Sequence, residues 1–244
     1  MKLFNKQPSA FTALGNQINL LTKFLNNMKV LFKFSFLLLV LGLSFTACKK
    51  TAKGVDAKTT EAANSAAAAA TSDKMYTITD GQINWTATKV GGQHMGTVKV
   101  SGGEIAASNG KISAGTVNLD MTSIAVTDIK ADEGKEKLEV HLKSSDFFDV
   151  GAHPTGTFKV SSVSNSGASS SITGDLTIKG ISKSVTIPAN VVMAGNKISV
   201  VTPPFKINRT DWDVKYGSGI INTAKDKIIH DEISLVLDLQ GMAK

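Results

Sequence analysis

Apolar and polar residues alternate along most of the chain from Met75 to the C-terminus. One side of each run stays apolar, while the other side carries Thr, Ser, Asn, Lys and Asp. Alternation with period two is typical of β-strands that bury one face. One-sided strands throughout predict a single shared interior, as in a barrel or sandwich. The clearest apolar positions are Ile83, Trp85, Ala87, Val98, Val100, Val117, Leu119, Met121, Leu176, Ile178, Val185, Ile187, Ala189, Val191, Ile233, Leu235, Leu237 and Leu239.

Turn-forming dipeptides separate several of these runs and support an antiparallel arrangement. They are of the hairpin type and occur at Asp80-Gly81, Gly102-Gly103, Asn109-Gly110 and Gly195-Asn196. Strands do not alternate with helical segments, which disfavours a parallel sheet. The pattern therefore predicts an all-β fold.

One short helix is expected within residues 132–143. Asp132 and Glu133 would cap and charge its first turn, and Leu138 and Leu142 have the i, i+4 spacing of one helix face. This helix would interrupt the series of strands once.

The stretch 141–158, HLKSSDFFDVGAHPTGTF, contains an aromatic pair bounded by aspartates and ends in an alternating strand. Proline has no N–H to donate, so Pro154 suits the first residue of that strand. The stretch resembles the signature of the YceI-like family, where a similar H-L-K-S-x-D-F-F-D-V run precedes a Pro-containing strand start. Further segments match the family pattern in the same order: 94–100, 117–124, 174–180 and 205–217.

This resemblance covers roughly Met75 to the C-terminus and implies both a fold and a ligand. YceI-like proteins are polyisoprenoid-binding, lipocalin-like periplasmic proteins. We therefore expect an extended antiparallel eight-stranded β-barrel, with one short helix, that holds an isoprenoid chain in its lumen. The side chains expected to line the lumen are Trp85, Val98, Val117, Leu119, Met121, Phe147, Phe148, Phe158, Leu176, Ile178, Phe205 and Ile207. Candidates for the polar ends of the ligand site are His94, His141 and Arg209.

The charge balance narrows the choice of partners. The formal net charge is +7, but residues 1–47 contain five lysines and no acidic residue. Without these five lysines, the rest of the chain has 22 basic and 20 acidic residues. A nearly neutral domain lacks the electrostatic footprint that nucleic-acid binding requires, so no nucleic-acid partner is expected.

The N-terminal segment resembles a bacterial lipoprotein signal. Lys29 and Lys33 precede an apolar run at 34–45. This run is too short to span a bilayer, where about 20 residues are needed, but it suits a signal peptide. Small residues then precede Cys48, the only cysteine, as in a lipobox, although Phe45 stands where leucine is more usual. We expect cleavage before Cys48 and its lipidation; the alternative is a plain signal peptide with a chance cysteine.

The sequence predicts that the chain consists of a signal peptide, a tether and a barrel. Residues 48–73 are rich in Lys, Thr and Ala and have no aromatic residue, as in a disordered tether. Lys49 follows the cysteine, which by resemblance to bacterial lipoproteins favours attachment to the outer membrane. We expect the barrel to face the periplasm, and exposure on the cell surface is the alternative left open. Both Met1 and Met28 are left open as the start. The parts are a signal peptide at 1–47 (28–47 its functional part), the tether at 48–73 and the barrel at 74–244.

Few residues of the chain suggest a catalytic or metal-binding site. The sequence contains no Gly-rich phosphate loop and no H-E-x-x-H, C-x-x-C or G-x-S-x-G motif. The four histidines are too scattered to predict a metal site, and structural hydrogen bonding is the expected role of His94 and His141. We expect no enzyme activity, no metal and no cofactor other than a bound lipid.

Arg209 is the only arginine and lies in the run Arg-Thr-Asp-Trp-Asp. Its planar fork suits a phosphate or carboxylate, so one hypothesis is a headgroup contact at the barrel mouth. Trp212 and Tyr216 are assigned either to the lumen or to packing under a loop. The alternative for the arginine is a structural ion pair, with candidate partners Asp146, Asp211 and Asp213.

The predicted function is binding or carriage of a polyisoprenoid or similar long-chain apolar lipid in the cell envelope. Two alternatives stay open: a structural or stress-related envelope interaction module with a filled barrel, and an enzyme acting on an isoprenoid lipid. The apolar pattern fits a tunnel and a solid core equally well. The oligomeric state is also left open, a dimer included.

Overall fold

The computed structural model describes residues 55–62, 72–166 and 169–244. The predicted signal peptide, the predicted lipidation site Cys48 and much of the predicted tether lie outside the described residues. The chain divides into two units, 1–49 and 50–244, and the fold described below belongs to the second.

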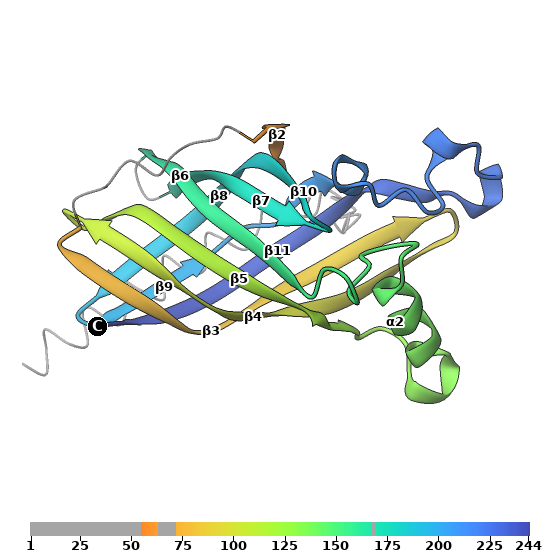
Figure 1. The fold of residues 1–244 in the computed structure, drawn as a ribbon, viewed down its shortest axis with the longest axis horizontal. Helices are drawn as coiled ribbons and strands as arrows, with labels where there is room; N and C mark the ends of the chain where they lie inside the picture. Colours follow the sequence, from red (N-terminus) through yellow and green to blue (C-terminus); the bar gives the residue numbers. More distant parts are fainter. Residues whose placement is uncertain (1–54, 63–71, 167–168) are drawn as a thin grey trace, which may run out of the picture. The chain divides into compact units, whose positions relative to one another are not determined.

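Eight strands form a closed antiparallel β-barrel (Figure 1). Each strand pairs with its neighbour in the order β11-β3-β4-β5-β6-β7-β8, and β9 pairs with both β8 and β11 to close the ring. The predicted eight-stranded antiparallel barrel is therefore confirmed. The strands are β3 (Lys74–Lys89), β4 (Gly92–Ser108), β5 (Lys111–Val126), β6 (Thr155–Ser166), β7 (Ser169–Ile178), β8 (Ile181–Ala194), β9 (Lys197–Val201) and β11 (Ile229–Ala243).

Short elements connect and extend the barrel. Strand β10 (Phe205–Asn208) pairs with the first part of β11, whereas β9 pairs with its last part. Within the described ranges, α2 (Lys135–Lys143) is the single α-helix. No helix in this part of the chain is both long and apolar enough to cross a membrane. The 3₁₀ turns are η1 (Ala131–Glu133), η2 (Arg209–Trp212), η3 (Gly219–Ile221) and η4 (Lys225–Lys227).

Residues 55–61, which the sequence assigned to the tether, are instead part of the barrel wall. Here β1 (Val55–Asp56) runs parallel to β10, and β2 (Lys58–Glu61) runs antiparallel to β8. The amides of Val55 and Ala57 donate to the carbonyl oxygens of Pro204 and Lys206, at 3.1 and 2.8 Å. The composition of the segment was a poor guide because exposed strand edges order it through main-chain pairing. This segment acts as one added strand between β10 and β8.

The predicted hairpin dipeptides divide into two groups. Asn109-Gly110 joins β4 to β5 with φ of 52° and 73°, as a type I′ turn requires. Gly195-Asn196 joins β8 to β9. The other two predictions were wrong, because Asp80-Gly81 and Gly102-Gly103 lie inside β3 and β4, beside irregularities of register. Glycine inside a strand marks such a bulge, and two bulges accommodate the bending of unusually long strands.

Helix α2 begins at Lys135 rather than at Asp132. Asp132 and Glu133 form η1, and Gly134 follows with φ of 96°. This left-handed conformation suits glycine and breaks the chain between the two helical pieces. Glu136 is consequently the acidic residue of the first turn of α2.

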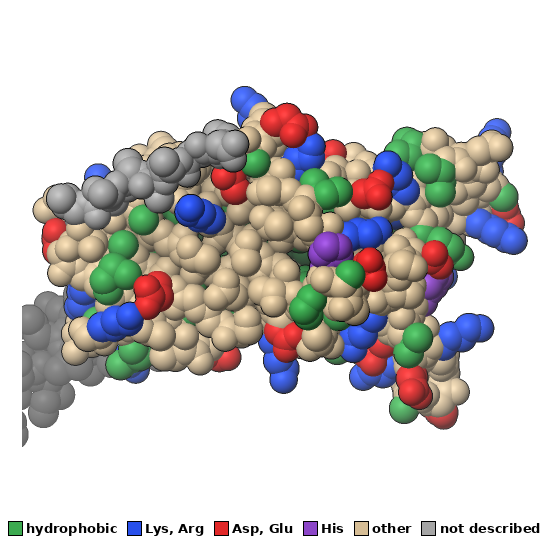
Figure 2. Space-filling model, in the orientation of Figure 1, with side chains coloured by type: hydrophobic (Ala, Val, Ile, Leu, Met, Phe, Trp, Pro, Cys, Tyr) green, Lys and Arg blue, Asp and Glu red, His purple; other side chains and the backbone are tan. Residues whose placement is uncertain are grey.

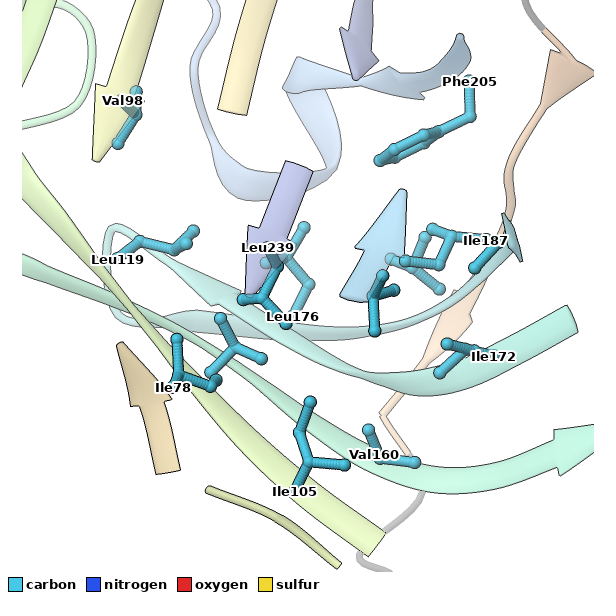
Figure 3. Close-up of a cluster of buried hydrophobic side chains, with 14 of the residues drawn as sticks. Ile78, Val98, Ile105, Leu119, Val160, Ile172, Leu176, Ile187, Phe205 and Leu239 are labelled. Carbon is cyan, nitrogen blue, oxygen red and sulfur yellow. The ribbon is translucent and has the colours of Figure 1, made fainter. Parts of the chain in front are cut away.

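Aliphatic side chains from several strands point into one shared interior (Figure 3). Ile105, Ile172 and Leu239 are among them. Tyr76 and Ile198 belong to the same cluster and are almost completely buried. We call the region around these five residues the β9 half of the interior, and the opposite region, beside α2, the α2 half.

Candidate functional site

Two neighbouring cavities lie in the α2 half of the barrel. The larger has a volume of about 110 Å³ and a wholly apolar surface. The smaller has a volume of about 50 Å³ and is likewise apolar. Ile83, Leu119 and Leu235 line both cavities, so the two spaces adjoin along the interior. The barrel therefore encloses apolar space in this half.

All twelve side chains predicted to line the lumen line one of these cavities. The role of these residues in ligand binding stays a prediction. The predicted residues around the larger cavity are Trp85, Val98, Leu119, Met121, Phe147, Phe148, Ile178 and Ile207. Those around the smaller are Val117, Leu119, Phe158, Leu176 and Phe205.

Several residues that line the larger cavity were not among the lining residues predicted from the sequence, and the role of Trp212 had been left open. Trp212 and Val214 follow β10, Ile229 begins β11, and Leu142 comes from α2. Trp212 is almost completely buried, and its Nε1–H donates to the carbonyl oxygen of Leu176 at 3.0 Å. The tryptophan thus belongs to the lumen wall, the first of the two roles left open for it. Its place beside Phe205 and Ile207 in one family-like segment was the available signal.

Two aromatic rings lie close to glycines of the barrel wall. Trp85 pairs in register with Gly96, where a Cβ would lie 2.3 Å from Cζ2 of the indole. At Gly174 a Cβ would lie 2.7 Å from Cζ of Phe158. The same Cβ atoms would lie still closer to backbone oxygens, 1.9 Å from that of Ala125 and 2.5 Å from that of Lys159. Only glycine therefore lets the ring and the neighbouring strand approach this closely. The two rings thus pack against the barrel wall and line the cavities.

His141 lies at the α2 end, among aromatic rings. Its ring packs edge-on against Phe147 and Tyr216, with centroids 5.0 and 4.7 Å away. Its Nε2 lies 3.1 Å from a carboxylate oxygen of Asp146. Because Phe147 lines the larger cavity, this cluster closes the cavity at the side of α2. Tyr216 is thus a packing residue of the closing cluster.

His94 has a separate partner and lines neither cavity. Its Nδ1 lies 3.0 Å from one oxygen of Asp128, and the amide of Met95 donates to the other at 2.9 Å. Partial burial opposes ionisation of Asp128, but the bonds from Met95 and His94 outweigh it and hold the pKa of this carboxyl below its usual value. His94 and His141 therefore each pair with a carboxylate of their own. Among the residues that can be described, no three potential ligands cluster as a metal site.

Arg209 is buried, with 3% of its surface exposed, and its donors bind the protein's own backbone. Nη1 donates to the carbonyl of Val214 at 2.6 Å, Nη2 to that of Ile229 at 3.0 Å, and Nε to that of His230 at 3.3 Å. Nη2 also lies 3.2 Å from Asp231. Burial lowers the pKa of the guanidinium, and Asp231 partly offsets this effect.

This geometry corrects the expectations for Arg209. The ion pair is structural, as one hypothesis held, but its partner is Asp231 and none of the three aspartates considered from the sequence. Only the apolar part of the side chain faces the cavity, whose surface is wholly apolar. The donors expected at a headgroup instead join the two ends of the segment between Val214 and Ile229.

Comparison with known proteins is consistent with this barrel. The sequence matches the YceI-like domain over residues 55–241. A UPF0312 protein of Pseudomonas paraeruginosa is 38% identical over 79 residues, 32% of this chain and 41% of that protein. Protein YceI of Escherichia coli is 30% identical over 118 residues, 46% of this chain and 62% of that protein. The chain therefore spans about half the length of these relatives.

A solved structure shares the fold. The crystal structure of BcnA from Burkholderia cenocepacia aligns with a TM-score of 0.53 and 22% identity, over 66% of this chain and 95% of BcnA. At this identity the likeness concerns the fold alone. Because the domain match includes nearly all of the described barrel, the chain belongs to the YceI-like family.

Proposed function

We propose that this protein binds a polyisoprenoid or a similar long apolar lipid inside its barrel. The observation that carries the proposal is the pair of adjoining apolar cavities in the α2 half. Membership of the YceI-like family and the barrel fold are consistent with a binding protein. The barrel wall supplies burial for hydrocarbon, and carriage of a lipid needs no catalytic group.

The volume of the cavities limits how much of a ligand fits before side chains of the wall move. A dry engineered cavity of about 150 Å³, lined by Leu, Ile and Phe, accepts benzene. The larger cavity here, at about 110 Å³, therefore has room for roughly one isoprene unit before anything moves. A longer chain must displace wall side chains, and Met121 is suited to this because methionine has three rotatable bonds. Ten sheltered carbons would contribute about 8 kcal/mol, which exceeds a modest cost of rearrangement.

The proposed place of action is the bacterial cell envelope. A lipid on Cys48 would hold the barrel at the outer membrane, facing the periplasm, as expected from the sequence. The lipid inside the barrel would then be a cargo distinct from the anchor. Detection of both requires that acyl chains bound to Cys48 be separated from freely extractable lipid.

Organic extraction tests the cargo directly. The full-length protein is produced in its native envelope, purified and extracted without hydrolysis, and the extract is analysed by mass spectrometry. We expect a long-chain isoprenoid lipid in an amount comparable to the protein, and none in a mock purification from cells lacking the protein. Recovery of protein without any such lipid would contradict the proposal.

A structural envelope module is the second candidate, because the packed β9 half and the small cavities also fit a scaffold. The two candidates differ in how lipid affects stability. A ligand that binds only the folded protein raises its free energy of unfolding in proportion to the logarithm of ligand concentration. A scaffold predicts no dependence of the unfolding midpoint on added polyprenol, whereas a carrier predicts an increase.

A further inference from the structure

A loop with exposed apolar side chains projects from the α2 end of the barrel. It runs from Lys215 to Ile228, includes η3 and η4, and is called the finger below. In Figure 1 it is the blue loop that extends past the turn between β3 and β4. Ile220 and Ile221 are 64% and 50% exposed, among the most exposed large apolar side chains of the described residues. Figure 2 shows apolar side chains on this projection, with basic side chains at its edges.

The charges of the finger suit an anionic surface. Lys225 and Lys227 follow the isoleucine pair and are exposed, with Asp226 between them. Lys215, at the base, is paired with Asp213 at 2.6 Å and is therefore largely neutralised. Exposed apolar side chains beside lysines are typical of segments that lie at the interface of an anionic bilayer.

The amides of the isoleucine pair are already hydrogen-bonded within the finger. Ser218 is fully buried, and its side-chain oxygen accepts from the amide of Ile220 at 3.2 Å. Its carbonyl accepts from the amide of Ile221 at 3.3 Å and from the hydroxyl of Thr223 at 2.6 Å. Insertion into a lipid interface is costly when backbone groups are unpaired. The two isoleucines therefore present apolar side chains while their own amides have partners, which lowers that cost.

The base of the finger connects rigidly to the larger cavity. Val214 and Ile229, its flanking residues, both line that cavity. Arg209 binds the carbonyl oxygens of both residues and so holds the two ends together. At the neighbouring turn the amide of Val90 donates to the carbonyl of Ile228 at 3.0 Å. The base of the finger is therefore held by residues that also form the cavity wall.

We propose that the finger docks on the surface of an anionic phospholipid bilayer. Ile220 and Ile221 enter the boundary between headgroups and acyl chains, while Lys225 and Lys227 contact lipid phosphates. Docking holds the α2 end of the barrel, with its cavity, against the membrane. This contact is separate from any lipid on Cys48, and it does not depend on the identity or presence of a cargo.

A local probe tests this contact in the full chain. Cys48→Ser removes the only native cysteine, and Ala224→Cys then carries an environment-sensitive fluorophore beside the isoleucines without replacing them. The matched control carries the same label at Val192→Cys, because Val192 is 60% exposed and lies in β8 near the β9 end. Both proteins are mixed with vesicles of phosphatidylglycerol and phosphatidylcholine whose acyl chains carry bromine as a quencher.

We expect a blue shift and strong quenching of the label at position 224, and neither effect at position 192. Lys225→Gln or Lys227→Gln lowers the vesicle partition constant, obtained by titrating the lipid, about fivefold each, since a lysine near an anionic surface contributes about 1 kcal/mol. Ile220→Ser with Ile221→Ser abolishes the quenching. Vesicles of phosphatidylcholine alone give a much weaker effect.

Three results would overturn the proposal: no quenching at position 224, equal quenching at both positions, or no dependence on anionic lipid. A blue shift that rises with protein concentration in the absence of vesicles assigns the finger to a second copy of the chain and also refutes membrane docking. None of these outcomes changes what organic extraction recovers, so failure of the docking proposal is distinguishable from failure of the cargo proposal.

Discussion

The two halves of the barrel interior are both apolar but are filled differently. In the β9 half, Tyr76, Ile198 and Leu239 retain only 1–2% of their exposure and pack together. In the α2 half, the apolar side chains surround cavities of about 110 and 50 Å³. Composition does not explain the difference, because the hollow half has the larger side chains, which would fill space and not leave it. Six aromatic rings line the two cavities: Trp85, Phe147, Phe148, Phe158, Phe205 and Trp212.

The number of strands in the barrel wall explains why the two halves are filled differently. At the β9 end, β9 alone bridges β8 and β11. Towards the α2 end, β10 takes the place of β9 beside β11, and the segment of β1 and β2 lies between β10 and β8. The wall therefore contains one strand more at this end, and the diameter of a barrel grows with the number of its strands. The wider end retains space that the narrower end fills with side chains.

The largest expected effect comes from truncation in the packed half. Leu239→Ala should lower the free energy of unfolding by about 2–5 kcal/mol, because the surrounding side chains cannot collapse into the new void. Met121→Ala, the matched change beside an existing cavity, should cost clearly less because Met121 has fewer packing partners to lose. Denaturant unfolding of both variants measures the difference. Equal costs would mean that the two halves are packed alike.

Arg209→Lys should lower the free energy of unfolding by about 2–3 kcal/mol. Lysine cannot reproduce the planar set of donors that binds three carbonyl groups, and hydrogen bonds to charged groups are worth about 1.5–3 kcal/mol. Amide hydrogen exchange should accelerate first at residues 229–231, because Arg209 binds carbonyl oxygens at this start of β11. Uniform acceleration throughout the barrel would show instead that the arginine stabilises the whole fold and not the α2 end in particular.

Met121→Trp tests the hollow half by filling it. The indole should occupy much of the larger cavity at a cost of about 1 kcal/mol, the low end for overpacking, because space is available. Extraction of the variant should then recover less lipid per protein than extraction of the parent chain. Unchanged occupancy would exclude Met121 from the ligand site. Leu239→Ala serves as a control in which stability falls but the cavity is untouched.

The smallest effect concerns Asp128 at the rim of the α2 half. Because its pKa is lowered in the folded protein, its stabilising contribution is present above the ordinary carboxyl range near pH 4 and is lost as pH falls through the lower folded pKa. Asp128→Asn should cost about 0.5–1 kcal/mol at neutral pH, since the pair lies near the surface. The penalty should shrink in acid, as measured by unfolding at pH 7 and pH 3. A constant penalty would assign the effect to geometry and not to charge.

The alternation of apolar and polar residues was sufficient to predict the barrel, but not the bulges and loop contacts that depart from regular strands. Inward positions such as Trp85 and Leu119 follow directly from period two, because a strand with one buried face permits no other pattern. Gly102-Gly103 misled because glycine pairs serve both hairpins and bulges, and only the register of the neighbouring strand distinguishes them. Asp231 could not be chosen as the partner of Arg209, because the loop that brings them together has no periodicity.

The sequence was enough to predict which side chains line the candidate site, but not the volume of the cavities among them. The family-like segments identified which side chains face inward, yet the space among them depends on the width of the wall. That width reflects residues 55–61, whose Lys- and Thr-rich composition resembles a linker. Their order comes from backbone bonds to β10 and β8, a contribution that side-chain patterns do not record.

The added strand has a consequence for how the protein folds. Residues 55–61 are synthesised before any other strand of the barrel, but their partners in β8 and β10 follow more than a hundred residues later. Contacts so distant along the chain form late, because a long loop must close before they contribute. The pairing of β3 with β11 joins residues just as distant, so the added strand and the closure of the barrel should both form late. The newly made protein should then pass through a state in which its apolar interior is still accessible from the side.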